Sequence, residues 1–266
     1  MNIQILLSTM NKKNINDVEQ TLKRMKVTKS ALVINQITTK INTFTNEGQH
    51  HIICKEEKGL SKSRNLAIQN FSGDVGIIAD DDIVYEEDYY HKIEKAYRTH
   101  PDADIIAFYV ESKNKKRPTK KQKTHRVNWI TAMRISSFQI TIKKGIYPSF
   151  DEEFGAGTKY LMGEESIFLY DCLRQNKKIY YIDEKIATAE QKESTWFKGY
   201  NKEYFKAEGA IFYRISSLWY IPLILQFSIR KHNKWEANIK QTINWMLEGA
   251  REYKNGRKSK CYHTSL

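Results

Sequence analysis

The chain has 266 residues, of which 40% are hydrophobic and 28% are charged. This length and balance exclude a disordered tail and predict one large domain, or one domain with an appendage. Its 44 Lys and Arg against 31 Asp and Glu give a net charge of +13, an excess that attracts nucleic acid, anionic lipid surfaces or phosphorylated ligands without choosing among them.

The cysteines and the N-terminus indicate the compartment. Cys54, Cys172 and Cys261 form neither a CxxC pair nor a Cys/His spacing, so we expect no disulfide framework and no zinc site. The opening residues, MNIQILLSTMNKKN, lack the basic region and the apolar length of a signal peptide. No stretch reaches the length of a transmembrane helix. We therefore expect a cytoplasmic protein, either free or bound peripherally to the inner membrane face.

Strands and helices alternate in the first part of the chain. Short apolar runs predict strands, and apolar residues at helical spacing predict helices, with Ser61 as a cap. The strands are expected over residues 3–8, 31–34 and 50–54, and the helices over 15–25 and 60–71. This alternation predicts an open, mostly parallel α/β sheet flanked by helices. Ligands of such sheets bind outside the carboxyl ends of the strands.

The most informative stretch is an apolar run, residues 75–79, that leads directly into Asp80, Asp81 and Asp82. Its continuous apolar character is typical of a strand covered on both faces. Adjacent carboxylates repel one another unless a cation lies among them, and Mg²⁺ and Mn²⁺ prefer oxygen ligands together with substrate phosphates. The stretch therefore predicts a metal–diphosphate site, with a solvated acidic turn as the alternative.

The next elements follow the same alternation. We expect a helix over residues 89–97, and strands over 104–110, 137–142 (an edge-type strand) and 178–182. Residues 113–126 carry eight Lys or Arg and no acid, with Pro118 inside, which predicts a loop. A solvated loop is favoured here over a dedicated phosphate or acceptor contact.

A glycine-rich segment precedes a second acidic feature. Gly155, Gly157 and Gly163 predict a mobile loop, after which Glu164 and Glu165 occupy the first turn of a helix. The helix dipole favours acids at that position, which accounts for one glutamate on structural grounds alone. A pair of glutamates after such a loop could also supply a general base.

The composition changes after residue 190, where the chain becomes aromatic and basic. One helix is expected to contain Phe205, Phe212 and Ile215. The run over residues 218–232, LWYIPLILQFSIRKH, is the most apolar and ends in basic residues. It is too short to span a bilayer. A buried helix that closes the core, or a homodimer contact, is the favoured interpretation, and peripheral membrane contact is the alternative. A last amphipathic helix is expected over residues 235–250, and a frayed basic tail from Lys254.

In this order and spacing the motifs resemble family 2 glycosyltransferases, which have the Rossmann-like GT-A nucleotide-binding fold. The resemblance rests on the opening strand, GLSKSRNLAI, IIADDDIVYEEDY and FGAGTKYLMGEESIFLYDCL. We expect residues 1–190 to form the GT-A catalytic domain and residues 191–266 a helical, aromatic and basic extension. ESTWFKGY before an apolar C-terminal helix is similar to bacterial members that build capsule, exopolysaccharide or lipopolysaccharide chains.

The resemblance implies inverting transfer from a nucleotide sugar, expected to be UDP-linked, to a glycan or lipid-linked acceptor, with Mn²⁺ or Mg²⁺ as cofactor. Glu165 matches the catalytic base and Glu164 the first member of its acidic pair. The implied metal ligands are Asp80, Asp81 and Asp82. The implied nucleotide-sugar contacts are Ser8, Thr9, Asn35, Gln36, Lys62, Arg64, Asn65 and Asp80.

The chain departs from the family pattern in three places. Ala79 stands at the first acid of the usual D-x-D-D motif, so Asp80 with Asp82 is an alternative metal pair. The base is a glutamate rather than an aspartate, and no His near residues 190–194 corresponds to the later metal or diphosphate contact.

Two other functions compete with glycosyl transfer. A non-catalytic nucleic-acid binder would use the net positive charge, but no nucleic-acid-binding module pattern is present, so no nucleic-acid partner is expected. A nucleotidyltransferase on a similar sheet would release pyrophosphate, whereas a glycosyltransferase that uses a UDP-sugar releases UDP.

Overall fold

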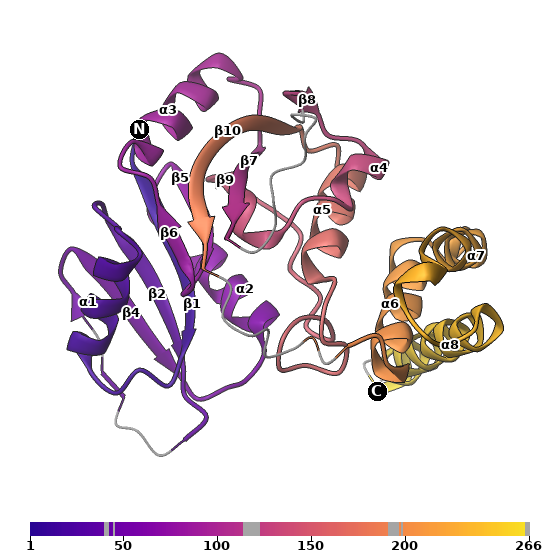
Figure 1. Ribbon diagram of the computed structural model, residues 1–266. Helices are drawn as coiled ribbons and strands as arrows, with labels where there is room; N and C mark the ends of the chain where they lie inside the picture. Colours follow the sequence, from indigo (N-terminus) through magenta and orange to yellow (C-terminus); the bar gives the residue numbers. More distant parts are fainter. Residues whose placement is uncertain (40–42, 45, 114–122, 191–196, 198, 264–266) are drawn as a thin grey trace.

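The computed structural model describes the chain except for residues 40–42, 45, 114–122, 191–196, 198 and 264–266 (Figure 1). Its helices are α1 (Ile15–Arg24), α2 (Leu60–Asn70), α3 (Tyr89–Thr99), α4 (Trp129–Ala132), α5 (Glu164–Arg174), α6 (Lys202–Ile215), α7 (Tyr220–Lys231) and α8 (Ile239–His263), with 3₁₀ turns at Ser137–Gln139 and His232–Lys234. Its strands are β1 (Ile3–Met10), β2 (Ala31–Gln36), β3 (Asn46–Glu47), β4 (His50–Lys55), β5 (Val75–Asp80), β6 (Ile83–Tyr85), β7 (Ile105–Ser112), β8 (His125–Arg126), β9 (Ile140–Lys143) and β10 (Ile179–Ala189).

The strands form one mixed sheet in the order β3-β4-β2-β1-β5-β9-β7-β10-β6, with β8 paired to β10. The four strands β4, β2, β1 and β5 are mutually parallel, and β7 is parallel to β10. Side chains alternate between the faces, so Leu6 packs in the core under α2 and α5 while Ile5 and Leu7 pack in the core under α1 and α3. The predicted α/β fold with a mostly parallel sheet is confirmed.

The predicted edge strand over residues 137–142 is wrong in both form and place. Residues Ser137–Gln139 form a 3₁₀ turn, and only β9 that follows is a strand. β9 lies in the middle of the sheet, antiparallel to both β5 and β7. Its short alternating pattern does not distinguish an edge strand from a central one. Alternation shows which residues share a face of the sheet, but not which strands lie on either side.

Some helix boundaries also differ from the predictions. The N-cap of α2 is Gly59, at φ 126°, and makes no side-chain cap. Ser61 therefore lies inside the helix, where its hydroxyl donates to the Phe154 carbonyl at 2.6 Å. α8 begins after Trp235, at Ile239, and continues beyond Lys254, where a frayed tail was expected. Of the predicted basic loop, residues 114–122 lie outside the described residues, and its end forms β8.

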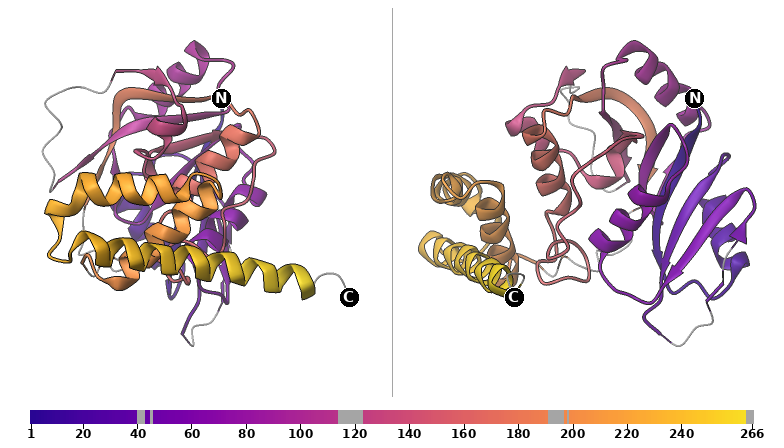
Figure 2. Two further views of the ribbon diagram at one scale, coloured as in Figure 1. Left: turned by 90° about the vertical axis from the view of Figure 1, so that its right-hand side faces the viewer. Right: turned by 180° about the vertical axis from the view of Figure 1, so that it is seen from behind.

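The helices α6, α7 and α8 gather at one side of the molecule (Figure 2) and share an apolar cluster of Phe205, Phe212, Ile224 and Met246. α6 and α8 cross backbone to backbone at two glycines. A Cβ on Gly209 would lie 1.8 Å from the Met246 carbonyl oxygen, and one on Gly249 would lie 2.0 Å from that of Lys206. The expected helical appendage is thus present. None of the helices within the described part of the chain combines the length and apolar character needed to cross a bilayer.

Candidate functional site

The carboxyl ends of β1 and β5 bring the first predicted site residues together. The strands are parallel neighbours with Ser8 in register with Asp80. Thr9 Oγ1 donates to Asp81 Oδ2 at 3.0 Å, and Lys12 Nζ lies 3.5 Å from the same oxygen. Ser8 Oγ accepts a hydrogen bond from Ser63 of α2 at 2.8 Å. The strand ends and the start of α2 therefore form one polar edge, as the topology of parallel sheets requires.

Arg64 of α2 is the centre of this edge and is only 2% exposed. Its Nη1 donates to Glu164 Oε1 at 2.7 Å, and its Nη2 donates to Asp80 Oδ1 at 3.0 Å and to Ser137 Oγ at 2.9 Å. Burial by itself lowers the pKa of the Arg64 guanidinium, but Asp80 and Glu164 more than offset this and raise it above its ordinary value. The buried cation is therefore compensated by charge-assisted hydrogen bonds that it donates to acceptors on three separate segments.

The two glutamates of α5 differ in their surroundings. Glu164 is buried and paired with Arg64, so its carboxylate is held in the interior. For Glu165, desolvation and then the charge of Glu164 raise the pKa to about 8. Glu164 is therefore a carboxylate held in place by its cation. Glu165 has a proton affinity that suits a general base near neutral pH.

The start of α5 depends on glycines. The N-cap Gly163 has φ 90°, and a Cβ there would lie 2.3 Å from Cδ1 of Ile211 on α6. A Cβ at Gly155 would lie 3.2 Å from the Glu164 carboxyl carbon. Larger side chains would therefore separate the glycine-rich segment and α6 from the first turn of α5. The predicted helix with both glutamates in its first turn is confirmed.

Three amide side chains predicted to contact the nucleotide make hydrogen bonds to backbone groups. Asn35 exchanges two hydrogen bonds with the backbone of Lys12, at 3.0 and 2.9 Å. Gln36 donates to the Gly59 carbonyl at 3.0 Å. Asn65 exchanges two hydrogen bonds with the backbone of Phe150, at 2.7 and 3.0 Å. These hydrogen bonds fix the segments around the site.

The remaining predicted contact, Lys62, lies half-buried on α2. The main-chain oxygen of Asp82 accepts from the Glu190 amide at 2.8 Å, which joins the end of β10 to the aspartates. Residues 191–194, where the later family contact was sought, lie outside the described residues.

The aspartates do not form a metal cage by themselves. Within the described ranges, no group of three or more His, Cys, Asp or Glu side chains is arranged to hold an ion. Asp80 is already paired with Arg64, whereas the Asp81 side chain is 37% exposed. Asp81 and Asp82 are both partly exposed at this edge. Two such carboxylates fit an ion that takes its other ligands from water and a diphosphate, the usual arrangement for Mg²⁺.

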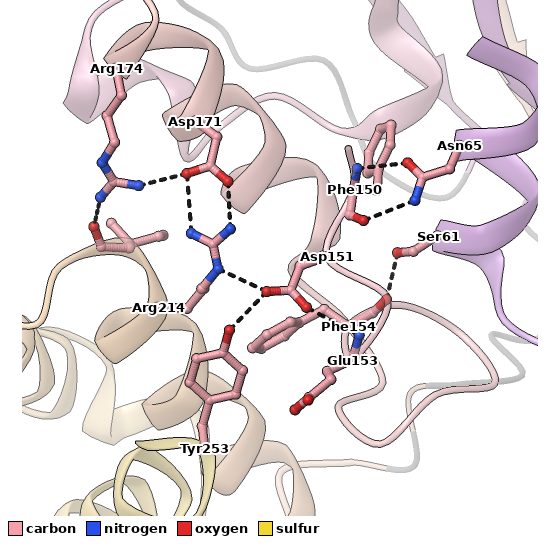
Figure 3. A network of polar contacts seen from close by, with 11 residues as sticks. Ser61, Asn65, Phe150, Asp151, Glu153, Phe154, Asp171, Arg174, Arg214 and Tyr253 are labelled. Atoms are coloured by element: carbon pink, nitrogen blue, oxygen red, sulfur yellow. Dashed lines mark hydrogen bonds and ion pairs between the residues drawn. The ribbon is translucent and has the colours of Figure 1, made fainter. Parts of the chain in front are cut away.

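Several residues of the site were not found by sequence reasoning. Ser63 and Lys12 belong to segments quoted there, but their contacts with Ser8 and Asp81 were not predicted. Ser137 lies in a segment interpreted as a strand. Arg214 and Asp151 belong to a further cluster (Figure 3), for which the sequence carries no local signal because the two residues are distant in the chain.

The comparisons with known proteins agree with this geometry. The family model described as Glycosyl transferase family 2 matches residues 33–162, which include α2, the aspartates, Gly155 and Gly157 and end just before Gly163 and the two glutamates. S. aureus TarS 1-349 in complex with UDP-GlcNAc superposes with a TM-score of 0.57 at 14% identity, covering 88% of this chain and 73% of that chain. S. aureus TarS 1-349 alone gives 0.56 at 11%, covering 96% and 92%. The complex of the same fragment with UDP gives 0.55 at 13%, covering 89% and 73%. At these identities the likeness establishes the fold. No curated protein matches the sequence.

Proposed function

Because the family model described as Glycosyl transferase family 2 matches residues 33–162, we propose that the protein is an inverting enzyme that transfers a sugar from a UDP-linked donor to a glycan or lipid-linked acceptor in bacterial surface polysaccharide synthesis. The observation that carries the proposal is the polar edge where Arg64 joins Asp80 to Glu164, with Glu165 next to it. The solved TarS complexes with UDP-GlcNAc and UDP support a UDP-linked donor. We keep residues 1–190 as the proposed catalytic domain and 191–266 as its extension.

The proposed chemistry is a single displacement. The acceptor hydroxyl oxygen attacks the anomeric carbon and gives its proton to the Glu165 carboxylate. The bond from that carbon to the diphosphate oxygen breaks on the opposite face, and UDP leaves with the electron pair. The new bond therefore has inverted configuration. A raised pKa suits Glu165 to hold the transferred proton.

Asp81 and Asp82 are the proposed holders of a Mn²⁺ or Mg²⁺ ion, whose charge would compensate the diphosphate as it departs. Asp80 is assigned a positioning role because Arg64 already binds both of its oxygens. Ser8, Thr9 and Lys62 remain the proposed side-chain contacts for the donor. Asn35, Gln36 and Asn65 are proposed to act by fixing the backbone around it.

Replacing Asp81 with asparagine is expected to abolish metal-dependent donor binding, because the amide removes a charge from the proposed metal site. Calorimetric titration of UDP should show that Mn²⁺ strengthens binding to the wild-type protein by about tenfold or more, and that the variant loses this gain. Asp102→Asn is the matched control, since that aspartate pairs with Lys178 on the surface. UDP binding that is equal with and without Mn²⁺ in the wild type would contradict the metal assignment.

We also propose that the outer face of α7 rests on an anionic membrane surface. The apolar residues exposed there and just before the helix include Leu218 at 85%, Trp219 at 66% and Ile229 at 64%. Residues 216–235 contain no acid and carry Arg230, Lys231 and Lys234. Apolar side chains beside basic ones are the pattern of a helix that lies in a membrane interface. This would place the enzyme at the inner membrane face, near a lipid-linked acceptor.

Cosedimentation with lipid vesicles tests the membrane contact. The wild-type protein is expected to bind phosphatidylcholine vesicles containing an anionic lipid and not neutral ones, and Trp219→Ser with Ile229→Ser should reduce binding several-fold. Ile146→Ser is the control, because Ile146 is 87% exposed outside α7. Absence of binding at low salt would refute the contact. A dimer mass in light scattering that these two substitutions abolish would instead assign the face to a homodimer.

A further inference from the structure

A cluster of partly buried charges joins the C-terminal helices to helix α5 (Figure 3). Arg214 of α6 donates from Nη2 to Asp171 Oδ2 at 2.6 Å and from Nη1 to Asp171 Oδ1 at 3.1 Å. Its Nε donates to Asp151 Oδ2 at 2.8 Å. Each of these three side chains is 16% exposed. Arg214 therefore connects α5 to the segment before the glycine-rich loop in one bidentate and one single contact.

Asp151 is held by a second C-terminal helix. The hydroxyl of Tyr253, on α8, donates to the same Asp151 oxygen at 2.8 Å. Tyr253 is buried, and its ring contacts that of Phe154 edge-on at 5.2 Å. Two helices that contribute no residue to the polar edge thus fix the position of one aspartate.

The residue before Asp151 reaches the polar edge. Phe150 exchanges two backbone hydrogen bonds with Asn65 of α2, next to Arg64. Its ring stacks on Phe168 of α5 at a centroid distance of 4.2 Å and an angle of 7°. The Arg64 guanidinium lies 5.7 Å from the centre of the same ring. Phe150 and Asp151 together therefore join α2, α5, α6 and α8.

These contacts determine how α5 presents its first turn. Glu164, Phe168 and Asp171 are spaced by four and then three residues, so they share one face of the helix. Arg64 binds the first, Phe150 packs on the second and Arg214 binds the third. Glu165 follows Glu164 directly, so any rotation of α5 about its axis displaces its carboxylate. Displacements of about 1 Å in such groups can cost about 10²-fold in rate.

We infer that Arg214 is a positioning residue for the transfer reaction, through which the C-terminal helices fix the orientation of the catalytic helix α5. The expected effect on the transfer rate rests on the proposed function. The expected effect on the orientation of α5 rests on the contacts alone. It extends the role of residues 191–266 from an appendage to a part of the machinery that places Glu165.

The test compares full-length Arg214→Gln with Lys206→Gln. Lys206 lies on the same helix and pairs with Glu248 and Glu252 of α8, so the control removes an equal charge without touching Asp151 or Asp171. UDP release from a panel of UDP-sugars should give a kcat at least about tenfold lower for Arg214→Gln. The dissociation constant for UDP should stay within about twofold. Hydrogen exchange of the peptide covering residues 164–174 should accelerate only in this variant.

A second variant guards against a folding defect. Arg214→Lys keeps the charge but cannot hold both aspartates in the same planar geometry, so its kcat should fall between those of the wild type and Arg214→Gln. An unchanged kcat in Arg214→Gln would overturn the inference, and so would an equal loss in Lys206→Gln. If the wild type releases no UDP from any donor, the proposed function fails. Hydrogen exchange of α5 then still decides the structural part, which unchanged exchange would overturn.

Discussion

Replacing Glu165 with glutamine is expected to lower the rate of sugar transfer by about 10²–10⁴-fold, the usual contribution of a general base. Glutamine has nearly the same shape but cannot accept the acceptor's proton. Because the glutamate is not among the proposed donor contacts, the dissociation constant for UDP should not change. The measurement is UDP release in the presence of acceptor or, where no acceptor is in hand, the slower release as water takes the sugar.

Glu164→Gln is the matched control, because it makes the same chemical change one residue earlier. Glu164 pairs with the buried Arg64, so its loss should reduce the free energy of unfolding as well as the activity. Glu165→Gln should not reduce the free energy of unfolding at neutral pH and should raise it, because the amide carries no proton that is lost as the pH rises. Wild-type rates in the Glu165 variant would show that another group accepts the proton.

The pH dependence of both quantities follows from Glu165. Desolvation and the charge of Glu164 raise its pKa from the ordinary 4.5 to about 8. Since transfer needs the ionised carboxylate, kcat should rise as the pH increases through that value. The free energy of unfolding should move in the opposite direction. The folded state binds this proton more tightly than the unfolded chain, so the stabilisation is complete below pH 4.5 and is lost as the pH rises through about 8. Glu165→Gln should remove this loss of stability.

Replacing Arg64 with methionine is expected to lower the free energy of unfolding by about 3–5 kcal/mol, the typical result of removing one partner from a buried ion pair. The substitution preserves much of the apolar volume but leaves Glu164 and Asp80 without their cation and Ser137 without its donor. Urea denaturation followed by circular dichroism gives the change directly. The same variant should not bind UDP, because the polar edge loses its centre.

Arg98→Met provides the comparison for this measurement. The Arg98 side chain is 74% exposed and pairs with Glu94 one turn earlier on α3, and such surface pairs contribute little. Its unfolding midpoint should match that of the wild type. If Arg64→Met had the same free energy of unfolding as the wild type, the buried contacts of Arg64 would not stabilise the fold. The role of Arg64 would then be functional only.

The sequence by itself determined the elements and the edge at which they meet. Strands buried on both faces appear as continuous apolar runs, so β1, β2 and β5 could be placed. The order of strands and helices then put Ser8, Arg64 and the aspartates at one edge. The first turn of α5 was also predictable, because a glycine before a pair of acids is a local signal of a helix start. These patterns involve residues that are close in the chain.

Only the tertiary structure decided what each polar side chain binds. Asn35, Gln36 and Asn65 matched the family by position, yet their amides bond to backbone from other segments. Arg64 finds one partner 100 residues away in the chain, and Arg214 finds one 63 residues away. Hydrophobic periodicity tells which face of an element is buried, but it carries no information on which segment covers that face. The partners of buried charges are fixed by packing, because a buried charge must be compensated by whatever group packing brings within reach.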